Sequence, residues 1–199
     1  MKKLLLFAAL LTLISFKTAD TTLTAEERKF AIDELNRTKE NLLNSIKGLS
    51  KEQLSFKSSP TSWSIAECTE HLAISEGNLW GALDGALKAP ADPTKRAEVK
   101  FTDADLIKMI TDRSWKVKTP EPFEPKGVTH EDAIKDFTVK RDAHMEYVKT
   151  TGDDLRNRYA QFPFGTMDAY QLILFMAGHS TRHTAQIEEV KADANYPKK

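Results

Sequence analysis

The sequence contains a single cysteine, Cys68, among its 199 residues, and this scarcity limits the sites that the protein can build. One thiol forms no intramolecular disulfide, and it cannot supply the several thiolates of a zinc ribbon or an iron–sulfur cluster. A metal site in this chain would therefore take its ligands from His, Asp or Glu. We expect Cys68 itself to be a small core residue rather than a nucleophile, because a lone helical cysteine is usually inert.

A surplus of charge of either sign is also missing. Lys and Arg together number 29 and Asp and Glu together number 29, so the formal net charge is zero. Proteins dedicated to nucleic acids carry a broad basic surplus, and we therefore expect no nucleic-acid partner. With 40% hydrophobic and 29% charged residues, the composition differs from that of disordered chains and predicts a folded core.

The apolar run at the N-terminus is too short to span a membrane. Leu4–Phe16 follows two lysines and falls short of the ~20 apolar residues that cross a bilayer. A positive start before a short apolar run is typical of a secretory signal peptide, whereas the alternative, a short buried helix, is disfavoured by the polar residues that follow. We expect residues 1–19 to be this signal and residues 20–199 to form one domain. The mature protein would then be periplasmic or secreted, with no stable membrane anchor.

No segment alternates apolar and polar residues clearly enough to predict a strand, and no internal repeat is present. Apolar residues instead recur with a helical period along four long segments. The predicted helices run from residue 25 to 47, from 65 to near Pro90, from Thr129 to Gly152, and from Asp168 to Ala192.

Capping sequences mark where three of these helices begin. Thr24–Glu27 and Ser64–Glu67 each place a hydroxyl three residues before a carboxylate, which is the arrangement of a capping box. Thr129–Asp132 repeats this spacing at the third helix. Residues 89–128 predict a long connection that carries one short helix around residues 106–110. The predicted fold is all-α, a four-helix bundle with this long connection between its second and third helices.

Three histidines are candidates for a metal site inside the bundle. His179 and His183 lie four residues apart in the last predicted helix, so their side chains share one face, within the apolar seam. His71 lies in the second helix, in a stripe of small and polar residues. If these helices face each other, three imidazoles meet and leave an open position, as in catalytic metal centres. Nitrogen ligands favour zinc, nickel, copper or iron over magnesium or calcium.

The spacing alone leaves open the alternative that these are hydrogen-bonded core histidines. His130 falls in the first turn of the third helix and His144 near its charged side, so we expect both at the surface or its boundary. Glu67 and Gln186 are the nearest polar residues that could orient the histidines. Glu67 is already explained as a capping residue, and Gln186 as an amide at the helix surface or seam.

Two motifs make the sequence similar to a known family. Trp63–Glu67 leading into Glu70–Leu72, and Gly178–Ile187 near the C-terminus, resemble the DinB-like superfamily, including its YfiT-type metal-dependent hydrolases. The resemblance covers roughly residues 24–195. It implies a four-helix bundle of the DinB/YfiT-like type that binds a divalent transition metal, commonly zinc or nickel. The ligands that it implies are His71, His179 and His183.

The resemblance implies a fold and a site more directly than it implies a reaction. The superfamily includes thiol-dependent transferases and many proteins without an established reaction. We predict an exported metal-dependent hydrolase or thiol-type transferase that acts on a small molecule, and the signal peptide disfavours transfer because such thiols are chiefly cytosolic. The alternatives are a metal-binding or ligand-binding module without catalysis and a purely structural bundle. A homodimer through an exposed helix face is left open.

Overall fold

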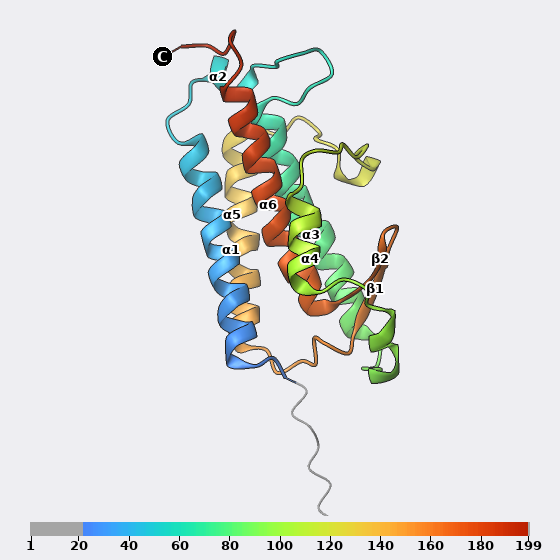
Figure 1. Ribbon diagram of the computed structural model, residues 1–199. Coiled ribbons are helices and arrows are strands. Elements are labelled where there is room, and N and C mark those ends of the chain that lie inside the picture. Colours follow the sequence, from blue (N-terminus) through green and yellow to red (C-terminus); the bar gives the residue numbers. More distant parts are fainter. Residues whose placement is uncertain (1–21, 199) are drawn as a thin grey trace, which may run out of the picture.

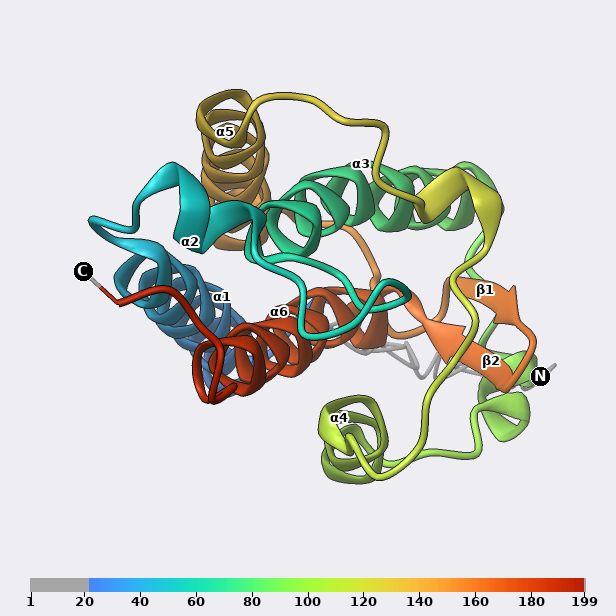
Figure 2. The same ribbon diagram turned by 90° about the horizontal axis from the view of Figure 1, so that it is seen from above.

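A computed structural model describes residues 22–198, and four long helices form its bundle (Figure 1). They are α1 (Ala25–Ile46), α3 (Ile65–Lys88), α5 (His130–Thr150) and α6 (Ala169–Lys191). Each helix packs against two others, in the cyclic order α1, α6, α3 and α5 (Figure 2). The predicted all-α four-helix bundle is confirmed. The expected signal peptide, residues 1–19, lies outside the described residues.

Shorter elements occupy the connections between the long helices. They are α2 (Lys51–Ser55), η1 (Pro93–Glu98), α4 (Asp103–Thr111), η2 (Glu121–Phe123), β1 (Tyr159–Phe162) and β2 (Gly165–Asp168). The short helix expected in the long connection is α4, which packs against the outer side of α6 (Figure 2). Within residues 22–198, none of the helices combines the length and the apolar character needed to span a membrane.

The three predicted helix starts are confirmed by their hydrogen bonds. Thr24 Oγ1 accepts the Glu27 amide at 3.1 Å, and the Glu27 carboxylate accepts the Thr24 amide at 2.9 Å. Ser64 and Glu67 form the same reciprocal pair at 3.2 and 2.7 Å. At α5, Thr129 caps the first turn. Each cap satisfies backbone amides that have no partner inside the helix, and losing one typically costs ~1 kcal/mol.

The prediction of no strands was wrong, because β1 and β2 pair as an antiparallel hairpin with Phe162 opposite Gly165. Each strand has only four residues, too few for an alternating pattern to stand out in the sequence. In β2, the consecutive residues Thr166, Met167 and Asp168 are all buried, so alternation is absent there too. The hairpin packs against α3 and α6, and this tertiary support determines its conformation.

The apolar core consists of two clusters separated along the bundle. One cluster surrounds Leu35, Leu83 and Leu172, and the other surrounds Leu42, Leu72 and Ile187. Between them lies a buried polar layer to which all four long helices contribute, made of Thr38, Glu76, Arg141, His144 and Ser180. Cys68 is fully buried in the second cluster, as expected. Burial raises the pKa of its thiol to about 12, so it stays protonated.

Candidate metal centre

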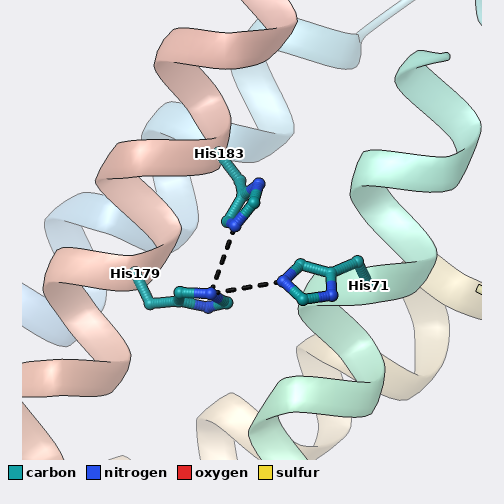
Figure 3. Close-up of side chains that lie close together, drawn as sticks. All are labelled: His71, His179 and His183. Atoms are coloured by element: carbon teal, nitrogen blue, oxygen red, sulfur yellow. Dashed lines mark hydrogen bonds between the residues drawn. The ribbon is translucent and has the colours of Figure 1, made fainter. Parts of the chain in front are cut away.

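Helices α3 and α6 pack together and bring the three predicted histidines to one place (Figure 3). His71 projects from α3, and His179 and His183 project from successive turns of α6. One ring nitrogen of each residue lies within 4.8 Å of those of the other two. The fold therefore brings His71 next to two histidines that lie more than one hundred residues later in the sequence.

The spacing of the ring nitrogens fits a single ion. His179 Nε2 lies 3.2 Å from His71 Nε2 and 3.1 Å from His183 Nε2. Two nitrogens that bind one ion tetrahedrally at ~2.0–2.1 Å stand roughly 3.3 Å apart. Both of these spacings are close to that value, and the ring nitrogens of all three residues lie within 4.8 Å of one another.

Hydrogen bonds determine which nitrogen of two rings carries its proton. His71 Nδ1 lies 2.7 Å from the Phe123 carbonyl oxygen, and His183 Nδ1 lies 3.0 Å from Gln186 Oε1. These oxygens only accept hydrogen bonds, so both Nδ1 atoms donate and both Nε2 atoms present a lone pair.

The neighbouring protein groups cannot satisfy both of these lone pairs. His179 can offer at most one N–H to this space, and one proton cannot serve both acceptors. Ser75 Oγ lies 3.5 Å from His71 Nε2, which is too long for a strong hydrogen bond. Converging lone pairs on neutral imidazoles are the donor set that a divalent transition metal requires, so the residues fit such an ion.

Burial keeps the three imidazoles neutral. His71 and His183 are buried and His179 is half-buried. Desolvation lowers the pKa of His71. It lowers the pKa values of His179 and His183 well below the usual range, and the neighbouring histidines lower both further. A neutral imidazole is the form that binds metals, so the ring need not lose a proton before binding.

Aromatic rings enclose the histidines. The Trp63 ring lies 4.8 Å from the His71 ring and 6.0 Å from the His183 ring, measured between centroids. Phe175 stacks on His179 at 5.8 Å. These contacts restrict the rings and remove water from their faces, which strengthens electrostatic interactions at the site. The half-buried His179 leaves the site partly reachable from solvent.

Of the two predicted orienting residues, one contacts the histidines and the other does not. Gln186 accepts the His183 Nδ1 proton, and Arg113 Nη1 reaches the same amide oxygen at 3.5 Å. The Glu67 carboxylate instead accepts the Ser64 amide and pairs with Lys57 at 2.7 Å. Glu67 is therefore a capping residue.

Sequence reasoning missed two contributors to the site. Trp63 was named only as the first residue of a family motif, and its position directly before the Ser64 cap was the available signal. The Phe123 carbonyl carried no signal, because every residue has a carbonyl and only the fold decides where it points.

The other two histidines lie outside the site. His130 sits partly buried at the first residue of α5, at the boundary, as predicted. The expectation for His144 was wrong, because its side chain is buried. Its Nδ1 lies 2.9 Å from Glu76 Oε2, and its ring stacks on Trp80 at 4.1 Å. These partners offset the cost of burial, and they come from another helix that the spacing along α5 does not reveal.

Comparison with known proteins identifies the class. A sequence profile of the DinB superfamily matches residues 34–187, and the chain therefore belongs to this superfamily. The chain is also similar to the uncharacterized protein YuaE of Bacillus subtilis (strain 168), with 27% identity over 151 residues that cover 74% of this chain and 89% of YuaE.

A solved structure supports the same fold. YfiT from Bacillus subtilis, described as a probable metal-dependent hydrolase with an unusual four-helix bundle topology, aligns with a TM-score of 0.59 and 14% identity. The alignment covers 88% of this chain and 92% of YfiT. At this identity the likeness shows a shared bundle, and the chemistry has to be argued from the three histidines themselves.

Proposed function

We propose that this protein is a divalent-metal-dependent hydrolase that acts on a small molecule, with His71, His179 and His183 as the metal ligands. The observation that carries the proposal is the convergence of their ring nitrogens, with His179 Nε2 3.2 and 3.1 Å from its two neighbours. The description of YfiT as a probable metal-dependent hydrolase agrees with this choice.

The proposed site has metal ligands and residues that orient and cover them. A divalent cation with an open position supplies Lewis acidity and lowers the pKa of water that it binds. His71 and His183 offer Nε2, while Phe123 and Gln186 hold their Nδ1 protons and thus the ring orientations. Trp63 covers two of the rings. Zinc and nickel are the cations that we propose, since imidazole nitrogen suits both.

The first test is metal content. The full chain, purified without an affinity tag, should contain close to one equivalent of zinc or nickel by elemental analysis, and His183→Ala should lose it. His130→Ala is the matched control, because it removes a histidine outside the site and should keep the metal. A wild-type protein that neither contains nor takes up metal would contradict the proposal and favour a structural bundle.

The second test is turnover. A panel of small esters and amides, assayed with and without chelator, should show hydrolysis that is lost in His183→Ala and retained in His130→Ala. A parallel panel of thiols and electrophiles separates hydrolysis from thiol-type transfer, which the same three ligands could serve. Bound metal without metal-dependent turnover in either panel would favour a binding module.

Export is part of the proposal and rests on residues 1–19 alone. Expression of the full chain followed by fractionation should place the protein outside the cytoplasm. Mass spectrometry of that fraction should show an N-terminus that begins near residue 20. Full-length protein that stays in the cytoplasm would contradict the proposal of export, and the proposal of a metal site would not be affected.

A further inference from the structure

Glu70 lies beside a proposed ligand in the chain, yet its carboxylate binds a loop. It precedes His71 on α3 and is only 3% exposed. Its Oε1 accepts the Lys126 amide at 2.6 Å, and its Oε2 accepts the Gly127 amide at 3.0 Å. A buried carboxylate needs such donors, because burial without them would be costly. Glu70 therefore ties α3 to the loop that precedes α5.

A second tie holds the same loop from one side of the metal centre. Asn78 Nδ2 donates to the Pro122 carbonyl at 2.8 Å. Between this contact and the Glu70 contacts, the Phe123 carbonyl accepts the His71 Nδ1 proton at 2.7 Å. Side chains of α3 thus hold both ends of the segment 122–127 by hydrogen bonds, and His71 bonds to the Phe123 carbonyl between them.

The loop requires anchors because its backbone forms no regular secondary structure between η2 and the start of α5. Gly127 has a φ of 87°, a conformation that favours glycine. This turn helps to direct two successive amides toward one carboxylate. Without the carboxylate, the loop would lose its contact on the C-terminal side of Phe123.

We propose that Glu70 is a positioning residue for the metal centre. By holding the Lys126 and Gly127 amides, it fixes the Phe123 carbonyl against His71 Nδ1. That hydrogen bond selects the His71 tautomer whose Nε2 lone pair faces His179 and His183. Neutral imidazole in water prefers the proton on Nε2, so the carbonyl reverses an intrinsic preference. The metal part of this inference rests on the proposed function, whereas the tautomer belongs to the protein without metal.

The decisive measurement is the tautomer of His71 in chelator-treated protein. Long-range ¹H–¹⁵N correlation spectra of the ¹⁵N-labelled full chain distinguish the two tautomers, and His71→Asn identifies the signals. The wild type should show Nδ1–H, Glu70→Ala should shift toward Nε2–H, and Glu70→Gln should be intermediate because it keeps one acceptor oxygen. Glu124→Ala removes an exposed carboxylate from the same loop and should match the wild type.

The second measurement is zinc affinity by calorimetric titration. Partners that orient metal-binding histidines typically contribute 10–100-fold to affinity. Glu70→Ala should therefore weaken zinc binding by roughly tenfold or more, and Glu124→Ala should leave it unchanged. A Glu70→Ala protein with wild-type tautomer and wild-type affinity would overturn the proposal. A wild type that binds no zinc would refute the proposed function, while the tautomer comparison would still decide the role of Glu70.

One further measurement uses only the wild-type protein, so its result does not depend on whether the variants fold. Hydrogen exchange of the wild type should show protected amides at Lys126 and Gly127, although both residues lie on an exposed loop. Free exchange at both amides would show that Glu70 does not hold them, and it would overturn the proposal without any substitution.

Discussion

Two buried polar clusters lie within the same bundle, and their hydrogen bonding differs. One is the buried polar layer that contains Glu76 and Arg141, here called the ionic layer. In it, Arg141 donates hydrogen bonds to both carboxylate oxygens of Glu76, to the Thr38 and Ser180 hydroxyls, and to the backbone carbonyls of Leu35 and Met176. His144 completes the layer through Glu76. In the histidine cluster, the Nε2 atoms face one another. A closed network holds helices together, whereas converging acceptors without enough donors indicate a place for a ligand.

The electrostatics of the two clusters differ in the same way. Burial acts to raise the pKa of Glu76, but Arg141 and the hydrogen bond from His144 outweigh it and lower this pKa to about 2. Glu76 and Arg141 therefore remain a charged pair inside the protein. At the histidine cluster, burial and mutual repulsion keep the rings neutral. The ionic layer contains a charged pair that neutralises itself, whereas the neutral histidine cluster can accept a cation.

The largest expected effect comes from breaking the ionic layer. Arg141→Met leaves the Glu76 carboxylate buried without its main partner, and we expect the free energy of unfolding to fall by about 3–5 kcal/mol. Urea denaturation measures this loss. Arg37→Met is the control, because Arg37 pairs with Glu34 on the surface and its removal should change little. Equal effects of the two substitutions would mean that the layer is not a stabilising network.

Acid should weaken the ionic layer in a defined pH range. The pKa of Glu76 is lowered in the folded protein, so its contribution is present above its unfolded pKa and is lost as pH falls through ~4.5 toward about 2. The lowering corresponds to roughly 3 kcal/mol. Glu76→Gln should show a flatter decline of stability than the wild type between these pH values. Parallel curves for the two proteins would contradict the assignment.

Metal should stabilise the folded protein through the histidine cluster alone. At zinc concentrations of about 100 times the Kd, ligand binding should raise the free energy of unfolding by ~2.7 kcal/mol. Thermal unfolding with and without zinc measures this gain. His183→Ala should lose it with little change in the metal-free protein, and His130→Ala should keep it. Stabilisation that persists in His183→Ala would place the metal elsewhere.

The smallest expected effect concerns the orientation of one ring. Gln186→Ala removes the acceptor for His183 Nδ1, and we expect zinc affinity to fall by roughly tenfold, the lower end of the range for such partners. Calorimetric titration measures the change. Gln161→Ala changes an exposed residue of β1 outside the site; it is the matched control and should bind zinc as the wild type does. An unchanged affinity in Gln186→Ala would show that its amide does not orient His183.

Features that depend on neighbouring residues were predictable. The cap of α3 needs only Ser64 and Glu67, three residues apart, and both hydrogen bonds form as expected. The shared face of His179 and His183 follows from the helical period. Features that depend on distant partners were not predictable in the same way. The hairpin at residues 159–168 relies on packing against two helices, and the burial of His144 relies on Glu76.

The sequence by itself determined the four long helices, their first turns and the pairing of two histidines on one face. Each of these depends on groups within one or two turns of helix, where covalent geometry sets the distances. Only the tertiary structure decided that the His71 ring meets that pair with its Nε2 turned inward. That outcome requires two helices to pack and a loop carbonyl to receive a proton, and such contacts exist only once the chain has folded.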